Sequence, residues 1–178
     1  MNTSNPTHPP RPASASVPHR DGHDHVNPAD ETLAALAAAT DDGPVVMLNL
    51  NRYRERAQYP DGTADADVSG REAYLRYGAV AVEAIAATGG RILWSTDATE
   101  VVIGCDHDRY DEVVAVWYPS RAAFLGLASY PGYVEALVHR DAALQQASLI
   151  ATRGAPEPVL TTPFPQPPAT AAAEGGAS

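Results

Sequence analysis

Hydrophobic and polar positions alternate along this chain with two different periods. Between residues 44 and 53 apolar side chains take every second position, and Met47, Asn49 and Asn51 lie on the opposite side of an extended backbone. Residues 112–118 alternate in the same way, with two differently composed sides. Both segments are therefore predicted to be strands, and the first of them has one apolar face and one mixed face.

Helical spacing appears in the segments between these strands. Ser69 and Glu72 have the spacing of a capping box, and the apolar repeat that follows, from Tyr74 to Thr88, ends at Gly89-Gly90. Asn27-Pro28 has the residue types of a helix start. The remaining pattern predicts one helix in two pieces, over 121–129 and 133–144, interrupted by Pro131-Gly132. It predicts strands over 91–96 and 100–104, which together form one long interrupted ribbon, and a last strand over 145–153.

The predicted order is helix, strand, helix, strand, strand, helix, strand, which contains the ferredoxin-like split βαβ pattern. The fold class is therefore α+β with an antiparallel sheet that has helices on one face, plus a short N-terminal helix. A second copy placed on the open face would close a dimeric α/β barrel. The face that carries Asn49 and Asn51 is expected to line the interior of that barrel.

Composition limits the folded part to the middle of the chain. Many of the 16 Pro residues lie near the two ends, where few large apolar side chains are available to offset the entropy of ordering. We therefore expect a disordered arm over residues 1–26, one domain over 27–153 and a disordered Pro/Ala-rich tail over 154–178.

Charge, hydropathy and cysteine content argue against nucleic-acid-binding, membrane-spanning and disulfide-stabilised proteins. Lys and Arg number 12 against 22 Asp and Glu, for a net charge of −10, which argues against nucleic acid as a partner. No apolar run approaches the roughly 20 residues that cross a bilayer, and the N-terminus lacks a leader pattern. The single Cys105 cannot form an internal disulfide, and its expected state is buried and inert. A cytoplasmic protein without membrane contact is expected.

The motifs MLNL, SGREAYLRYG, GGRILWS, WYPSRAAFL and SLIATR occur in this order. Together they resemble the domain-of-unknown-function family 1330, within the dimeric α/β-barrel superfamily, over residues 27–153. The resemblance implies a ferredoxin-like protomer, a homodimer and a pocket between sheet and helices. It implies no catalytic residue, and the wider superfamily holds several chemistries, so the fold does not choose a reaction. Asn51, Arg52 and Tyr53 depart from the usual family pattern at the end of the first strand.

Polar residues on the first strand and the long helix are candidates for a substrate site. Asn49 and Asn51 need polar partners inside a sheet, either from a ligand or across the barrel. Arg52 could hold a carboxylate, with a surface ion pair as the alternative. Tyr74 and Tyr77 could bind or protonate a substrate, or pack in the core with their hydroxyls at its edge.

His139 is the only His within a predicted helix or strand, so it is the natural candidate for a general base. Its alternative role as a haem ligand has no other support in the sequence. Trp94 and Trp117, on strands that should be neighbours, would supply an aromatic wall for a flat substrate or would simply fill the core. The expected pocket is the Met47/Asn49/Asn51 face with both indoles beside it.

Metal and nucleotide chemistry find little support. His19, His23 and His25 lie with two Asp in the N-terminal arm, where adventitious metal binding is expected. Residues 106–111 form an acidic turn without the spacing of a calcium loop, and no phosphate-binding or nucleophile-elbow motif occurs. No metal and no organic cofactor are expected.

Two functions follow from these residues. The first is a small enzyme that modifies an aromatic or polyketide-like metabolite by acid/base chemistry, as an oxygenase, cyclase or isomerase. His139 or a Tyr would move the proton while Asn49 and Arg52 hold a developing oxyanion. The second is a non-catalytic dimeric small-molecule-binding or stress-associated protein, whose pocket only binds its ligand.

Overall fold

The fold is described from a computed structural model, which covers residues 26–40, 42–60 and 67–160. Residues 1–25 of the predicted arm, with the N-terminal His cluster, and the tail beyond residue 160 lie outside these residues. Four strands form the sheet: β1 (Val45–Tyr53), β2 (Arg91–Asp97), β3 (Glu112–Tyr118) and β4 (Leu144–Arg153). The helices are α1 (Asp30–Ala37), α2 (Gly70–Ala87), α3 (Arg121–Leu125) and α4 (Tyr133–Ala143), with short 3₁₀ turns η1 (Asp106–Asp108) and η2 (Gly126–Ser129).

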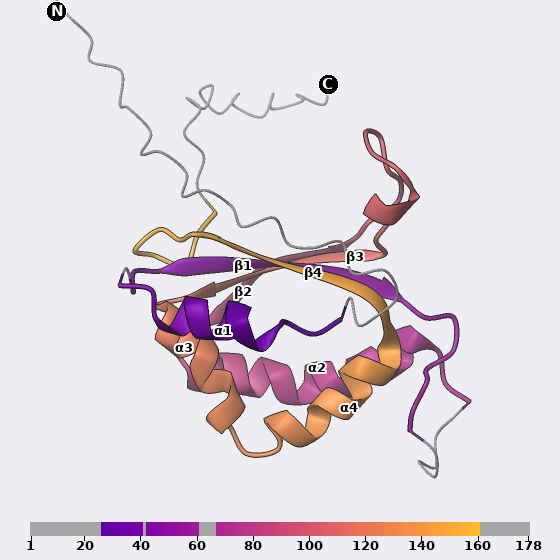
Figure 1. The fold of residues 1–178 in the computed structure, drawn as a ribbon, viewed down its shortest axis with the longest axis horizontal. Helices are drawn as coiled ribbons and strands as arrows, with labels where there is room; N and C mark the ends of the chain where they lie inside the picture. Colours follow the sequence, from indigo (N-terminus) through magenta and orange to yellow (C-terminus); the bar gives the residue numbers. More distant parts are fainter. Residues whose placement is uncertain (1–25, 41, 61–66, 161–178) are drawn as a thin grey trace, which may run out of the picture.

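The strand order in the sheet is β2-β3-β1-β4, and every neighbouring pair is antiparallel. All the α-helices lie on one side of the sheet, whereas the connection from β2 to β3 rises on the other side (Figure 1). This is the ferredoxin-like α+β arrangement that the predicted order of helices and strands indicated. The sheet therefore has a helix-covered face and a helix-free face.

Local sequence explains where α2 begins and ends. Ser69 accepts a hydrogen bond from the backbone of Glu72, and the Glu72 side chain accepts one from the backbone of Ser69, so the capping box is formed as predicted. The helix stops at Gly89, which has a φ of 79° and so adopts a left-handed conformation that favours glycine.

Three predicted elements differ in detail. The first helix is capped by Ala29 rather than Asn27. Residues 100–104 are not a strand, and Val102 and Ile103 are 87% and 94% exposed near the tip of the β2–β3 connection. The helix expected over 121–129 tightens into η2 after Leu125. Cys105 lies in the same connection and is exposed, which corrects the expectation that it is buried.

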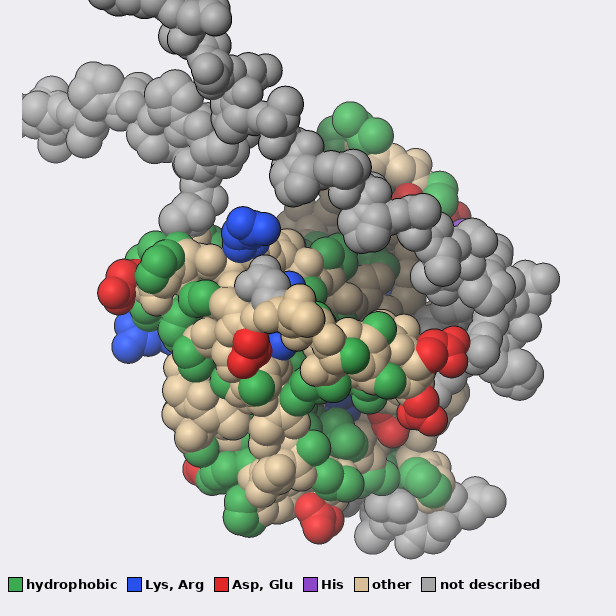
Figure 2. Space-filling model, turned by 60° about the vertical axis from the view of Figure 1, so that its left-hand side comes forward, with side chains coloured by type: hydrophobic (Ala, Val, Ile, Leu, Met, Phe, Trp, Pro, Cys, Tyr) green, Lys and Arg blue, Asp and Glu red, His purple; other side chains and the backbone are tan. Residues whose placement is uncertain are grey.

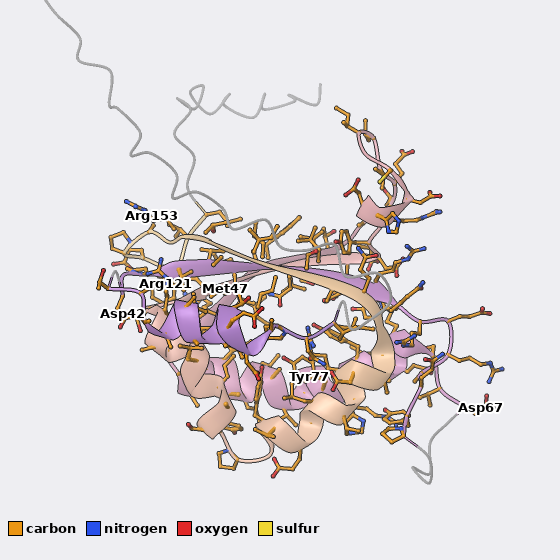
Figure 3. All side chains as sticks on the ribbon, in the orientation of Figure 1. Asp42, Met47, Asp67, Tyr77, Arg121 and Arg153 are labelled. Atoms are coloured by element: carbon orange, nitrogen blue, oxygen red, sulfur yellow. The ribbon has the colours of Figure 1, made fainter. Side chains whose placement is uncertain are left out.

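The main core lies between β1, β3 and the helices. Met47 and Val45 pack there with Val116, Ile85 and Leu127, and Figure 3 shows Met47 and Tyr77 in the layer between the sheet and the helices. Strand register puts Met47 opposite Val116 and Asn49 opposite Val114. The mixed face of β1 is thus the helix-covered face, which corrects the expectation that it would line a barrel interior.

The helix-free face carries its own apolar cluster of Val46, Ala115 and Trp117, with Leu48 and Leu93 packed against it. Trp94 is paired with Ala115 and therefore points to the same side. Part of this face is covered by the chain after β4, because the indole nitrogen of Trp117 donates a hydrogen bond of 2.8 Å to the carbonyl of Ala155.

On the face drawn in Figure 2, Lys and Arg side chains are few and scattered rather than gathered in a patch. Within the described ranges, no helix is long and apolar enough to cross a membrane.

Candidate functional site

A cavity of about 400 Å³ lies between the helix-covered face of the sheet and the helices. Its size is within the usual range for small-molecule pockets. Its walls come from all four strands, from α1, α2, α3 and α4, from η2 and from the segment that leads into α1. Most lining residues are apolar, including Met47, Leu33, Val116 and Leu137, and its polar groups are Asn49, Tyr53, Arg71, Tyr74, Tyr77, Ser95, Glu112, Tyr118, Tyr133, Arg140 and Asn27.

Glu112 is the one carboxylate among the described residues that line this cavity. Its Oε2 accepts hydrogen bonds from the hydroxyl of Tyr53 at 2.6 Å and from the side-chain amide of Asn51 at 3.1 Å. Glu112 is the first residue of β3 and is paired with Asn51 of β1, so the register of the sheet brings the two side chains together on one face. The carboxylate is held in place by two donors that point at one oxygen.

Asn51 extends this arrangement to α2. Its side-chain amide also donates to the hydroxyl of Tyr74 at 3.0 Å, and the residue is only 2% exposed. A buried amide needs polar partners, and here they are a carboxylate and a phenol. Asn51 does not line the cavity itself but positions two residues that do.

Tyrosines dominate the remaining polar surface of the cavity. The hydroxyls of Tyr77 and Tyr133 lie 3.0 Å apart. The ring of Tyr74 contacts the rings of Tyr53 and Tyr77, and the ring of Tyr77 also contacts that of Tyr133. Burial raises the pKa of Tyr74 to about 12. Burial also raises the pKa of Tyr77, with Tyr133 adding to the effect, and that of Tyr53, with Glu112 adding to it. These phenols are neutral hydrogen-bond donors rather than bases at ordinary pH.

Raised tyrosine pKa values predict a loss of stability at alkaline pH. A phenol whose pKa is higher in the folded state than the unfolded value of 10.0 stabilises the fold fully below pH 10. This contribution is lost as the pH rises from 10 through about 12. Phenolate absorbance of Tyr53, Tyr74, Tyr77 and Tyr118 should therefore appear together with the loss of circular dichroism.

Tyr118→Phe provides the control for this titration. Burial raises the pKa of Tyr118, so removing its hydroxyl should move the alkaline unfolding midpoint to higher pH. Complete titration of all eight tyrosines near pH 10 in a still-folded protein would contradict the prediction.

The other predicted site residues divide into those that reach the cavity and those that do not. Asn49, Tyr74 and Tyr77 line it, and Asn49 also donates to the backbone carbonyl of Met47 at 3.3 Å. His139, on α4, is not part of the cavity wall. Its Nδ1 instead lies 2.8 Å from the hydroxyl of Tyr59.

Arg52, Trp94 and Trp117 lie on the other side of the sheet. Arg52 follows Asn51 and therefore points to the helix-free face, where it donates to the carbonyl of Asp106. Trp94 and Trp117 share that face and are not among the residues of the cavity wall. The expected aromatic wall is thus made by tyrosines on α2 and α4 rather than by the two indoles.

Glu112, Tyr53 and Arg140 were not singled out by the sequence. The alternation of β3 could have indicated Glu112, because it puts this carboxylate on the same face of the strand as the apolar Val114. Among the described residues no group of three or more His, Cys, Asp or Glu side chains is placed to hold a metal ion.

These features define a ferredoxin-like α+β protein with a tyrosine-rich cavity between its sheet and helices. The chain belongs to a family described as "Domain of unknown function (DUF1330)", whose model matches residues 63–154. Predicted family membership is thereby confirmed.

Two solved structures of RPA0582 resemble the chain. One, of the methylated protein, is 37% identical with a TM-score of 0.68, and the match covers 74% of this chain and 95% of that one. The other, described as a protein of unknown function from Rhodopseudomonas palustris, is 36% identical with a TM-score of 0.67, and the match covers 75% and 98%. No curated protein matches the chain.

Proposed function

We propose that the protein is a small-molecule enzyme in which Glu112 accepts a proton from an apolar or aromatic substrate, without a metal or organic cofactor. The observation that carries this proposal is the placement of Glu112 as the lining carboxylate of a mostly apolar cavity, with one oxygen held by Tyr53 and Asn51. The other oxygen, Oε1, has one long contact among the described residues, 3.5 Å from the hydroxyl of Ser95. It is the oxygen available to a substrate C–H or O–H group.

The neutral tyrosines supply the complementary half of such a reaction. When a proton leaves a carbon next to a carbonyl, negative charge develops on the carbonyl oxygen, and preorganised donors in a water-poor site stabilise it. Tyr77 and Tyr133 contribute hydroxyls from the helices, and the hydroxyl of Tyr74 reaches from α2 to the sheet, where it accepts a hydrogen bond from Asn51. The carboxylate of Glu112 comes from the sheet itself. This division favours proton transfer of the isomerase or cyclase type, among the reactions that the sequence left open.

Gly78 supports a cavity kept open for a ligand. It lies inside α2, where glycine destabilises a helix relative to alanine. A Cβ atom built at this position meets nothing within 4 Å, and Gly78 lines the cavity. A position that could carry a larger side chain without conflict instead leaves space.

Kemp elimination of 5-nitrobenzisoxazole tests the proposed base. In this reaction a base removes the proton from the ring carbon, the N–O bond breaks, and a nitrile and a phenolate form, so the rate reports a carboxylate in an apolar pocket. We expect saturable acceleration by the wild-type protein and a loss of at least about 100-fold in Glu112→Gln, the usual size of a general-base contribution.

Glu83→Gln is the matched control, because Glu83 is bonded to Tyr130 away from the cavity wall and its loss should leave the rate unchanged. Equal rates in Glu112→Gln and wild type, or no acceleration by the wild-type protein, would contradict the proposed base. Ligand binding without any acceleration would instead support the alternative function, a protein whose cavity only binds its ligand.

We also propose that the protein acts as a homodimer joined through the helix-free face. Trp94 and Ile150 are 45% and 49% exposed there, beside the buried cluster of Val46 and Ala115. The β2–β3 connection rises on the same side and carries the exposed Val102 and Ile103 (Figure 1). Apolar surface of this kind on one face is typical of an interaction site.

A further inference from the structure

Arg140 is a cation placed in the wall of the cavity. It lies on α4, and its side chain is 16% exposed. Removing a guanidinium from water is costly unless anionic or hydrogen-bonding groups replace the water. The partners of Arg140 therefore show whether the protein itself neutralises this charge.

Among the described residues, the hydrogen-bond acceptors that Arg140 contacts are uncharged. NH1 donates to the side-chain oxygen of Asn27 at 3.0 Å, and NH2 donates to the backbone carbonyl of Val26 at 2.8 Å. The carboxylate of Asp141 lies 3.8 Å from NH1, beyond hydrogen-bond distance, and is 47% exposed. A guanidinium carries more N–H donors than these two contacts use. Within the described part of the chain, the close partners of the cation are thus neutral acceptors, and the carboxylate paired with it is the more distant, half-exposed Asp141.

The second arginine of the cavity wall differs in this respect. Arg71 donates to Asp97 at 2.7 Å, and its guanidinium lies 5.7 Å from the centre of the Tyr53 ring. Both partners of the Arg71–Asp97 pair are half-exposed or more. Arg71 therefore has a close anionic partner at the edge of the cavity, whereas the ion pair of Arg140 with Asp141 is longer, at 3.8 Å.

The surroundings of Arg140 suit a negatively charged oxygen. The positive charge of Arg140 acts on the hydroxyls of Tyr74 and Tyr77, where it opposes the effect of burial on their pKa. Glu112, the cavity's carboxylate, belongs to β3 and is hydrogen-bonded to Asn51 and Tyr53 rather than to Arg140. Arg140 thus acts on neutral phenol donors of the cavity, and the nearby carboxylate of Glu112 is already engaged by other donors.

We propose that Arg140 binds an anionic oxygen of the ligand, so that the cavity takes flat apolar or aromatic molecules that carry a carboxylate, sulfonate or enolate group. The proposal rests on the cavity of the proposed function and specifies its ligand class. Arg140 would orient the ligand's charged end beside Tyr74 and Tyr77 and leave the apolar body along the sheet.

Two dyes with the same ring system separate charge from shape. The anion 8-anilino-1-naphthalenesulfonate and the uncharged N-phenyl-1-naphthylamine both become fluorescent in apolar surroundings. Arg140→Gln should weaken binding of the anionic dye by at least about 10-fold, the factor that corresponds to 1.4 kcal/mol. It should change binding of the neutral dye by less than about 3-fold.

Three control variants assign the effect. Arg153→Gln removes an arginine at the end of β4, outside the cavity wall, and should change neither affinity. Asn27→Ala removes one acceptor of Arg140 but keeps the cation, so it should retain the anionic dye. Gly78→Phe fills the cavity and should weaken both dyes, which locates them there rather than on the helix-free face.

The outcomes separate this inference from the proposed function. Unchanged binding of the anionic dye in Arg140→Gln, or an equal loss of both dyes in a variant with wild-type circular dichroism and melting temperature, would overturn the role of Arg140. The Glu112 test would be unaffected by either result. Failure of both dyes to bind the wild-type protein, or binding that Gly78→Phe leaves intact, would overturn the cavity as the binding site and with it both proposals.

Discussion

Gly70→Ala is expected to lower the free energy of unfolding by more than about 4 kcal/mol, the range of single substitutions with severe packing conflicts. Gly70 is the first residue of α2 and sits where the end of β1 meets the end of α4. Its amide donates to the carbonyl of Arg54 at 3.1 Å, and the amide of Arg54 donates to the carbonyl of Ala143 at 2.8 Å. Three segments of backbone therefore converge on this position.

A methyl group at residue 70 has no space to occupy. A Cβ atom there would lie 2.5 Å from the carbonyl oxygen of Ala143 and 2.8 Å from the amide nitrogen of Arg54. Backbone atoms cannot rotate away as a side chain can, so either the hydrogen bonds of this junction or the packing of α2 must be lost. Ala73 and Leu144, both fully buried beside it, would be displaced as well.

Gly78→Ala is the matched control within the same helix. A Cβ atom at residue 78 meets nothing within 4 Å, and alanine is the better helix former by about 1 kcal/mol. Urea denaturation should therefore show the two Gly→Ala variants shifting in opposite directions. Equal midpoints for Gly70→Ala and the wild-type protein would show that the junction is not rigid.

Ile150→Glu is expected to convert the proposed dimer into a monomer. Ile150 lies on β4 opposite Leu48, on the helix-free face, and is 49% exposed in a single chain. A carboxylate there costs a monomer little, but burying it in an apolar interface without a partner costs several kcal/mol. Dimer affinity should fall by more than about 100-fold, or about 2.7 kcal/mol.

Light scattering coupled to size-exclusion chromatography measures this change directly. The wild-type protein should have twice the chain mass of 18.7 kDa, and Ile150→Glu should have the chain mass at the same concentration. Val134→Glu is the control, because Val134 is 54% exposed on α4, on the helical side of the molecule. A monomeric wild-type protein would refute the dimer, and a dimeric Ile150→Glu variant would place its interface elsewhere.

Local rules were sufficient for the elements of this fold. The capping box at Ser69 and the period-two alternation of residues 45–53 depend on neighbours within a few residues, and both occur as predicted. The order of elements then determined the antiparallel sheet. The exposed segment from Val101 to Gly104 was predicted wrongly as a strand, because its apolar run has the composition of a strand but pairs with no other strand.

Long-range geometry decided what the sequence could not predict. Alternation shows that Asn49 and Asn51 share a face of the sheet, but it does not show which face the helices cover. An amide can be hydrogen-bonded by water inside a barrel or by buried phenols under helices, so its presence does not decide between the two faces. Here Asn51 bonds Tyr74 and Glu112, partners that lie 23 and 61 residues away in sequence. The position of Glu112 in the site depends on strand register, which the pattern of a single strand does not contain.

The irregularity in β2 has a consequence for how this family can vary. Register shifts between Ile92 and Trp94, so that Leu93 and Trp94 both turn toward the helix-free face, while Ile92 and Ser95 stay in the cavity wall. Leu93 is the additional residue of this bulge. A relative that lacked it would restore simple alternation without turning Ile92 or Ser95 out of the wall. Length changes at this point would therefore remodel the helix-free face, through which we propose that the protein dimerises, and would leave the residues of the cavity wall in place.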